Sequence, residues 1–321
     1  MPEEERRTFW RKPPHQNGHC QKIGAKRLMP IWCGGKYKSV LLVLAGLLVL
    51  DGVIWYLILF PKGADGNLEL YFLDVGQGDS QLVNLPAGVQ VLIDGGPPNS
   101  RVLSELSEIL PASDSYIDLV VMTHPQLDHF GGLIDVLKKY KVGAFIGTGR
   151  KGEIDAYREL IHVLKNREIP YIVLEEGDRI KNGDNLFSVL SPNNQNLLSK
   201  ELNDTSLVLM LERGGLKALY TGDIGFSVEN YLTGKYDLRA QILKVPHHGS
   251  KFSSGAEFVG EVKPQVAVIG VGKNSYGHPT REALERIEEK GSRIFRTDQN
   301  ATVKVVLEDQ NLAIFAENDG Y

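Results

Sequence analysis

Residues 117–132 have the sequence IDLVVMTHPQLDHFGG, and this stretch decides how the chain is expected to fold. The apolar run IDLVVMT is typical of a buried strand, and Gly131-Gly132 is expected to begin a helix. The loop between them carries His124, Asp128 and His129. Imidazole and carboxylate groups four and five residues apart on such a loop can point at one pair of metal ions. Capping of a helix would explain Asp128 but neither the two histidines nor the glycines.

The histidines are distributed unevenly along the chain. Five of the eight follow the ends of strand-like runs, namely His124, His129, His247, His248 and His278. The other three, His15, His19 and His162, are expected to be ordinary solvated or satisfied side chains. Strand ends at one edge of a sheet are where α/β proteins build their sites, so the first five are candidates for a common site.

Two short segments add further candidate ligands. Thr221-Gly222-Asp223 ends a strand in an isolated carboxylate, which is a weak signal alone because aspartate is common in turns. His247 and His248 are adjacent, follow an apolar strand and precede a glycine. Packing does not readily explain such a pair, because neighbouring imidazoles point to opposite sides. A solvated turn is the alternative.

The loop Gly272–Pro279 combines a cation, an amide, a phenol and an imidazole, which suits an anionic group; a plain surface turn is the alternative. Bulk charge does not favour nucleic acid. Residues 1–62 hold ten of the 36 Lys and Arg but four of the 40 Asp and Glu, so residues 63–321 carry 26 basic and 36 acidic side chains, about −10. Binding of phosphates would depend on local cations such as Lys244, Lys251 and Lys273.

Residues 39–60, SVLLVLAGLLVLDGVIWYLILF, have one charge in 22 residues and are long enough to span a bilayer. A cleaved signal peptide would be shorter and end in small residues. Basic residues precede the segment in excess, which predicts a cytoplasmic N-terminus and an extracellular body. We expect residues 1–38 to be a basic disordered tail and 61–66 a linker. Asp51 is either a tolerated polar residue or a contact with another helix.

From Leu68 onward, strand-like and helix-like patterns alternate with turn signals. The apolar runs include LELYFLDV, VQVLID, LFSVL, QILKV and QVAVIGV, and the helical patterns include RVLSELSEIL, IDAYRELIHVLKNRE and REALERIEEK. This mixture predicts an α/β domain over 67–321, with two sheets covered by helices on the outside. Both cysteines, Cys20 and Cys33, precede it, which excludes disulfides and thiolate metal ligands within it.

Together, these motifs resemble the metallo-β-lactamase superfamily and, more narrowly, the metallo-β-lactamase domain of ComEC-like competence proteins. The segments that carry the resemblance occur in the family's order and are Leu73–Ser80, Ile93–Gly96, His124–Gly132, Asn203–Leu207, Thr221–Asp223, Pro246–Ser250 and Gly272–Pro279. The resemblance implies a four-layer αββα sandwich with the site at one edge, preceded by one transmembrane helix. The many further membrane helices of a competence channel are not seen, so transport of DNA by this polypeptide alone is not expected.

The resemblance also implies two divalent metal ions, zinc or manganese. The implied metal ligands are His124, Asp128, His129, Asp223 and His248, with Asp223 bridging, Asn203 adding to the His124 position and His247 as the alternative to His248. Residues expected to take part in catalysis are Asp128, Asp223, His247 and His278, and those expected to contact substrate are Asn203, Lys273, Tyr276 and His278. Asp94 and Gln126 are expected to orient ligands rather than bind metal.

Two departures from the superfamily pattern bear on the metal. Gln126 stands where a second loop histidine is usual, although ComEC-like members share this feature, and Asn203 stands where the next histidine ligand is usual. One metal position is therefore poorer in imidazole and richer in oxygen, which leaves room for manganese.

The predicted function is metal-dependent hydrolysis of a phosphodiester, with extracellular DNA as the favoured substrate. Two metal ions lower the pKa of a bridging water and clamp an in-line displacement, so no serine or cysteine nucleophile is required. A cell-envelope phosphodiesterase, of the kind that cleaves a phosphorylcholine ester, is one alternative. A non-hydrolytic, metal-binding module that handles DNA is the other. Antibiotic hydrolysis is disfavoured because the histidine-rich loop is altered.

Overall fold

The computed structural model describes residues 36–59, 67–308 and 311–317, which belong to two compact units, Met1–Phe60 and Pro61–Tyr321. The first unit contains one described helix, α1 (Lys36–Leu59). It begins three residues before the predicted apolar segment, and it is the one described helix long and apolar enough to cross a membrane. Most of the predicted tail and the whole predicted linker lie outside the described residues.

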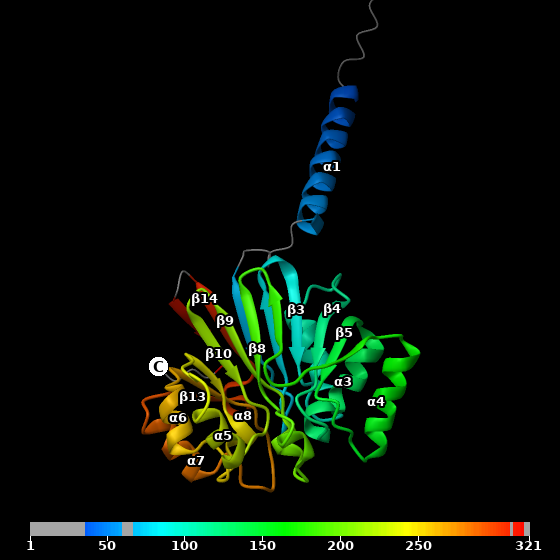
Figure 1. Cartoon of the computed structure of the whole chain (residues 1–321). Helices are drawn as coiled ribbons and strands as arrows, with labels where there is room; N and C mark the ends of the chain where they lie inside the picture. The colour runs from blue at the N-terminus through cyan, green and yellow to red at the C-terminus, as the bar shows by residue number, and fades with distance from the viewer. Residues whose placement is uncertain (1–35, 60–66, 309–310, 318–321) are drawn as a thin grey trace, which may run out of the picture. The chain divides into compact units, whose positions relative to one another are not determined.

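The second unit contains two sheets (Figure 1). The first has, in spatial order, β15 (Asn311–Phe315), β14 (Val303–Glu308), β1 (Leu68–Phe72), β2 (Gln81–Leu85), β3 (Val89–Ile93), β4 (Tyr116–Val121), β5 (Lys141–Gly147) and β6 (Tyr171–Val173). The second has β13 (Arg293–Arg296), β12 (Val266–Ile269), β11 (Ile242–Lys244), β10 (Leu216–Tyr220), β9 (Val208–Arg213), β8 (Asn185–Ser191) and β7 (Arg179–Asn182).

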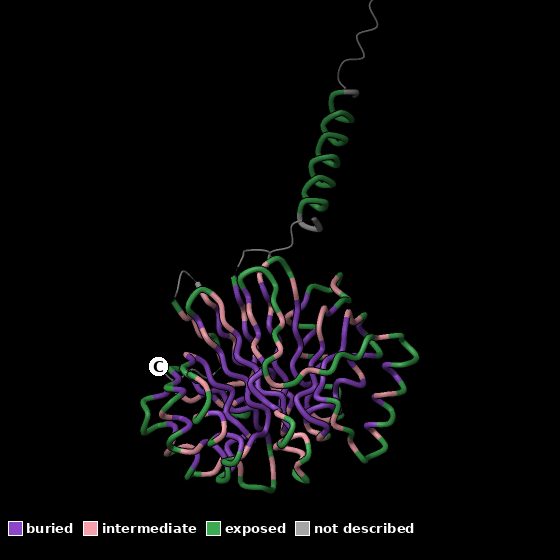
Figure 2. The backbone as a smooth tube through the Cα atoms, viewed as in Figure 1, coloured by how far each residue is buried: buried purple, intermediate pink, exposed green. Residues whose placement is uncertain are grey.

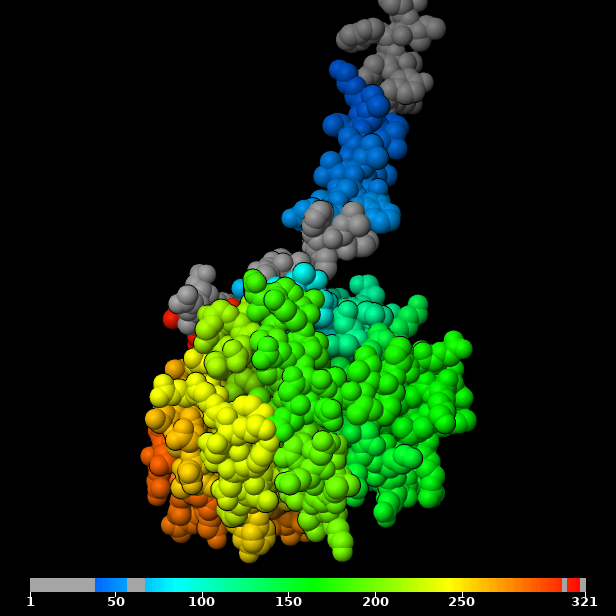
Figure 3. Space-filling model, viewed as in Figure 1, coloured from blue at the N-terminus to red at the C-terminus, as the bar shows by residue number. Residues whose placement is uncertain are grey.

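Helices cover the outer face of each sheet. The helices of the body are α2 (Arg101–Ile109), α3 (Leu127–Lys139), α4 (Asp155–Asn166), α5 (Phe226–Thr233), α6 (Ala256–Val262), α7 (Arg281–Glu288) and α8 (Thr297–Asn300). Short 3-10 turns lie at η1 (Pro86–Gly88), η2 (Asn196–Leu198), η3 (Leu202–Thr205) and η4 (Pro246–Gly249). In the space-filling view the green part of the body, with α4, and the yellow-to-orange part, with α5 to α7, occupy opposite sides (Figure 3).

Three apolar cores hold these layers together, and the buried residues gather in the middle of the body (Figure 2). One core fills the space between the sheets, one lies under α2 to α4, and one lies under α5 to α7. Adjacent residues on a strand point to opposite faces, so on β4 Val121 enters the first core and Val120 the second. Burial on both faces explains why this strand is apolar at every position from Ile117 to Val121 except Asp118. The predicted αββα sandwich is confirmed.

Several details differ from the prediction. Helix α3 begins at Leu127, so Gly131 and Gly132 lie inside it rather than at its start. A Cβ on Gly132 would overlap the carbonyl oxygen of Gly95, so these glycines allow the helix to approach the loop after β3. The short strands β6, β7 and β13 and the helices α5 and α8 were not predicted.

Candidate metal centre

The predicted site residues lie where parallel strands of both sheets end. Asp94 follows β3, the segment Thr123–His129 follows β4 and enters α3, Asp223 follows β10, and His248 follows β11. Strands β3, β4 and β5 are parallel in one sheet, and β10 to β13 are parallel in the other. Their carboxyl ends therefore bring these loops to one edge of the sandwich, as the sequence predicted.

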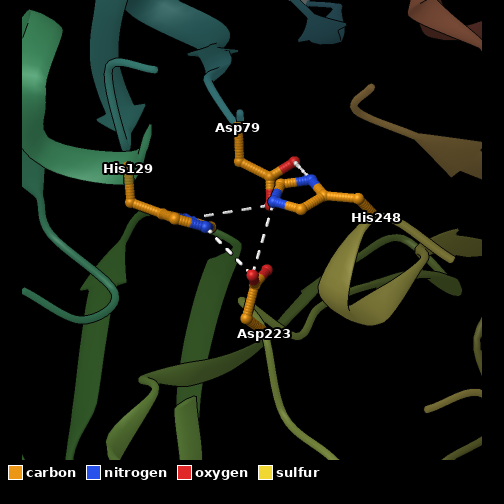
Figure 4. A group of neighbouring side chains, drawn as sticks. All are labelled: Asp79, His129, Asp223 and His248. Atoms are coloured by element: carbon orange, nitrogen blue, oxygen red, sulfur yellow. Dashed lines mark ion pairs between the residues drawn. The ribbon is translucent and has the colours of Figure 1, made fainter. Parts of the chain in front are cut away.

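Four side chains form the buried centre of this edge: Asp79, His129, Asp223 and His248 (Figure 4). Each offers a ligand atom within 4.8 Å of the others. Oδ2 of Asp223 lies 3.3 Å from Nε2 of His129 and 3.4 Å from Nε2 of His248. Oδ2 of Asp128 lies 3.4 Å from the same Nε2 of His248. These donors surround one position that a divalent cation suits.

Hydrogen bonds behind the rings decide which ring nitrogen faces that position. Nδ1 of His129 donates to Oδ2 of Asp94 at 2.8 Å, and Nδ1 of His248 donates to the carbonyl oxygen of Gly270 at 2.7 Å. Because carboxylates and carbonyls only accept, Nδ1 carries the proton in each neutral ring. The lone pair of each ring is therefore on Nε2, as in a metal-binding histidine with an oriented tautomer.

His124 is oriented in a comparable way. The Thr123 hydroxyl donates its proton to Asp94 at 2.6 Å, so its oxygen is free to accept from Nδ1 of His124 at 3.1 Å. Nε2 of His124 then carries the lone pair. The ring is fully buried, with its centroid 4.2 Å from that of His129. Burial, reinforced by the nearby His129, lowers the pKa of His124 to about 3, so its ring is neutral at physiological pH.

Unpartnered polar atoms show that these residues fit a metal ion. Among the described residues, no hydrogen bond satisfies the buried Nε2 atoms of His124, His129 and His248. Oδ1 of Asp223 and both carboxylate oxygens of Asp79 also have no hydrogen bond, and they contact charged neighbours only through ion pairs. Buried polar atoms are rarely left without a partner, and such a gap often marks a site for an ion. Imidazole nitrogen and carboxylate oxygen are the donors that zinc and manganese take in proteins.

The electrostatics of the centre favour a cation. Burial works to raise the pKa of Asp223, but His248, His129 and Lys244 outweigh it and hold that pKa well below its usual range. Burial works to lower the pKa of His129, but the carboxylates of Asp223 and Asp94 raise it well above its usual value. A proton and a divalent ion thus compete for the same imidazole nitrogen, so metal binding should release protons.

The two residues that depart from the superfamily pattern meet in the structure. Nε2 of Gln126 donates to Oδ1 of Asn203 at 2.5 Å, so these two amides are hydrogen-bonded to each other. The amide nitrogen of Asn203 also lies 3.3 Å from Nε2 of His247. That one of two metal positions is poorer in imidazole stays a prediction.

An open cleft of about 450 Å³ leads to the centre. Its lining residues are Gln77, Pro97, Pro98, Gln126, Leu127, Asp128, Asn203, Asp223, His247, His248, Tyr276 and His278. The structure therefore separates the adjacent histidines. His248 lies in the buried cluster, and His247 lies on the cleft wall, 5.5 Å from His278 between ring centroids. Burial, with His247 and His248 nearby, lowers the pKa of His278 to about 4, so this ring is neutral at pH 7.

Two lysines that we expected to meet phosphate are placed differently. Lys273 is exposed and is not among the residues that line the cleft. Lys244 is 1% exposed, and its ammonium group forms an ion pair with Asp79 inside the centre. The surface role predicted for Lys244 is therefore wrong, because its strand is buried and its charge is paired internally.

Asp79 is the residue of the cluster that the sequence analysis did not assign. It lies in the loop between β1 and β2, within one of the motifs that carried the family resemblance. A lysine inside the apolar run QILKV was the available signal for it, since a charge in a buried strand requires a buried partner of opposite sign.

Known proteins are similar to this chain in sequence and in fold. The model of the metallo-beta-lactamase superfamily matches residues 73–273. The chain belongs to the metallo-β-lactamase superfamily. Members are generally metal-dependent hydrolases, and the fold usually holds two divalent metal ions.

Individual relatives show which members of the superfamily this chain is similar to. ComE operon protein 3 of Bacillus subtilis is 32% identical over 273 residues, which cover 78% of this chain and 34% of that protein. Competence protein ComA of Neisseria gonorrhoeae is 30% identical over 234 residues, covering 72% of this chain and 31% of that one. The chain thus spans about a third of the length of these relatives. The predicted resemblance to ComEC-like proteins is confirmed.

A solved structure with the same fold is the metallo-beta-lactamase fold protein YhfI from Bacillus subtilis. It superposes with a TM-score of 0.50 at 13% identity, over 74% of this chain and 99% of that one. At this identity the likeness establishes the fold alone.

Proposed function

We propose that this chain is a membrane-anchored, metal-dependent phosphodiesterase. The observation that carries the proposal is the set of unpartnered, buried Nε2 atoms of His124, His129 and His248. They lie behind an open cleft that His248 lines together with the carboxylates of Asp128 and Asp223. Asp128, His129, Asp223 and His248 would hold one divalent ion, and His124 with Asp223 would hold a weaker second one. A bound ion supplies an activated water and positive charge for the phosphoryl oxygens.

The protein's own side chains complete the site. Asp94 fixes the ring of His129, and Gly270 fixes the ring of His248. His247, Tyr276 and His278 line the cleft and can donate hydrogen bonds to phosphate oxygens. Because His278 is neutral at pH 7, its role is to hold an oxygen rather than to supply a charge. No serine or cysteine lines the described cleft, so direct attack by water is favoured over a covalent intermediate.

DNA is the proposed substrate because the two relatives described above, from Bacillus subtilis and Neisseria gonorrhoeae, are ComEC-like competence proteins. The net charge of about −10 on residues 63–321 means that few phosphates can be contacted outside the cleft. We therefore expect weak DNA binding with a shallow salt dependence. For a single strand the slope of log K against log salt is about −0.7 per phosphate contacted, so a slope no steeper than about −2 is expected.

The helix α1 is proposed to anchor the chain, with the body outside the cell. The excess of basic residues before it supports this orientation. Protease added to intact, wall-stripped cells should then digest the body and spare a tag at the N-terminus. Protection of the body would overturn the outward orientation and the proposal of an extracellular substrate.

Substrate class is tested with the full-length chain purified in detergent. We would measure cleavage of a labelled single-stranded oligonucleotide and of bis-p-nitrophenyl phosphate across a salt series, with manganese and with zinc. Cleavage of both supports the nuclease proposal. Cleavage of the small ester alone would replace it with a cell-envelope phosphodiesterase. Cleavage of neither, with metal bound, would favour a non-hydrolytic module that handles DNA.

A further inference from the structure

One side of the buried centre faces the cleft, and Asp79 lies on the side away from the cleft. Its carboxylate oxygens lie 3.8 Å from Nδ1 of His129 and 3.6 Å from Nδ1 of His248. In His129 and His248, Nδ1 is thus on the side of Asp79, and the unpartnered Nε2 is on the side of Asp223 (Figure 4). Asp79 is 1% exposed and does not line the cleft, whereas Asp223 and His248 do.

Lys244 lies next to Asp79 and is equally buried. Its ammonium group pairs with Oδ2 of Asp79, lies 3.5 Å from Oδ1 of Asp223 and donates to the carbonyl oxygen of Gly222 at 2.9 Å. The contact with Gly222 is a hydrogen bond, whereas the contacts with the two carboxylates are ion pairs. Lys244 therefore contacts the carboxylate oxygen of Asp223 that is opposite to the one facing the histidines.

We propose that the Asp79–Lys244 pair positions the metal centre from behind. Lys244 holds Oδ1 of Asp223, so that Oδ2 stays directed toward the imidazoles, and Asp79 holds Lys244 rather than binding metal. The inference rests on the proposed function only in assuming that the centre binds a divalent ion. Both residues are positioning residues, since neither reaches the cleft.

Charge explains why two residues are needed. A lysine alone beside Asp223 would repel a divalent ion, and Asp79 cancels that charge within the same buried region. Removing one partner leaves the other as a buried, unpaired charge, which strongly destabilises the folded state. Removing both leaves the net charge of the centre unchanged but takes away the group that orients Asp223. The double variant therefore separates the positioning role from a role in stability.

The test uses the full-length chain in detergent, with Lys244→Met, Asp79→Asn and the double variant. Lys217→Met is the matched control, because Lys217 pairs with Glu212 on the outside of the same sheet. Melting is followed without metal, and manganese affinity is measured by calorimetry. Each single variant should melt on the order of 5–10 °C below the wild type. The double variant should recover most of that loss.

Manganese affinity then decides the proposal. In the double variant the dissociation constant should stay at least about tenfold above the wild-type value, as for other groups that orient metal ligands. A double variant that binds manganese as tightly as the wild type would overturn the positioning role. The absorption spectrum of the cobalt-saturated double variant should match that of the wild type, because Asp79 is not a ligand. A shifted band would overturn that part.

The same measurements distinguish a failure of the proposed function from a failure of this inference. If the wild type binds no divalent ion, the metal centre and this inference fall together. If the wild type binds metal and the double variant is unaffected, the inference alone falls.

Discussion

Asp94 accepts a hydrogen bond from Nδ1 of His129 at 2.8 Å and, on the same carboxylate, bonds from the hydroxyl and the backbone N–H of Thr123. This one buried carboxylate therefore orients His129 directly and His124 through Thr123. It connects both proposed metal positions without lining the cleft.

Replacing Asp94 should weaken metal binding without removing a ligand. In Asp94→Asn one accepting oxygen remains in place of two, so the amide cannot accept from His129 and from both donors of Thr123 at once, and the histidine rings are held less firmly. We expect manganese affinity to fall about 10–100-fold, as for other groups that orient metal ligands. Calorimetry on Asp135→Asn, on the exposed side of α3, gives the control. Unchanged affinity in Asp94→Asn would show that the hydrogen bond does not support the centre.

Gly132 is predicted to be intolerant of a methyl group. A Cβ there would overlap the carbonyl oxygen of Gly95, and His129 lies one turn earlier on the same helix. Gly132→Ala should cost about 1–3 kcal/mol of unfolding free energy by overpacking and should weaken metal binding. Gly260→Ala, in α6, meets nothing nearer than Lys290 at 3.6 Å and should stabilise by about 0.5–1 kcal/mol. Equal melting temperatures for the two variants would contradict this packing argument.

A histidine at position 126 should improve the weaker metal position. Gln126 lines the cleft, and its amide is hydrogen-bonded to Asn203. In Gln126→His an imidazole replaces that amide near His124, so zinc retained after desalting should rise toward two ions per chain. Gln195→His places a histidine on an exposed turn and controls for non-specific zinc. No gain over this control would show that residue 126 does not face the metals.

Glu229 should make stability depend on pH. Burial raises its pKa to about 7, against the opposing hydrogen bonds from the backbone N–H groups of Gly255 and Ser254. Because the folded pKa is the higher one, ionisation disfavours the folded state. Stability should fall as the pH rises from about 4.5 to 7, by on the order of 3 kcal/mol at most.

Comparison with Glu229→Gln isolates that dependence. Glutamine does not titrate, so the variant should gain stability relative to the wild type between pH 5 and pH 8, measured by denaturant unfolding at each pH. If the free energies of unfolding of the variant and the wild type differ by the same amount at every pH in this range, the titration of Glu229 is not the cause of the pH dependence.

The sequence correctly predicted which side chains meet at one edge of the sandwich where they follow strand ends, and their roles as metal ligands stay predictions. His124, His129, Asp223 and His248 each follow an apolar run, and parallel strands bring such ends together. It did not identify Asp79 or the buried role of Lys244. The lysine within QILKV indicates that a buried acidic partner exists, but the two residues are 165 positions apart, on elements of different sheets, so no local pattern identifies which acidic residue it is.

The fold was predicted in the same uneven way. The central strands and amphipathic helices bury apolar residues with a regular spacing, and they were recognised. Strands β6 and β7 are largely exposed, so they lack that spacing, and hydrogen bonding to a neighbouring strand defines them instead. The start of α3 was placed too late because Gly131 and Gly132 resemble a helix boundary, although close packing against Gly95 explains them.

Manganese-dependent turnover of bis-p-nitrophenyl phosphate by the full-length chain tests the proposed phosphodiesterase centre most directly. We expect the release of p-nitrophenolate to rise from background as manganese is added to chelator-treated protein, and to level off as the centre fills. Asp223→Asn should remain lower on the order of a hundredfold at saturating manganese, because the carboxylate shared by His129 and His248 has lost its charge. A wild-type rate that stays at background while manganese binds would contradict hydrolysis at this centre.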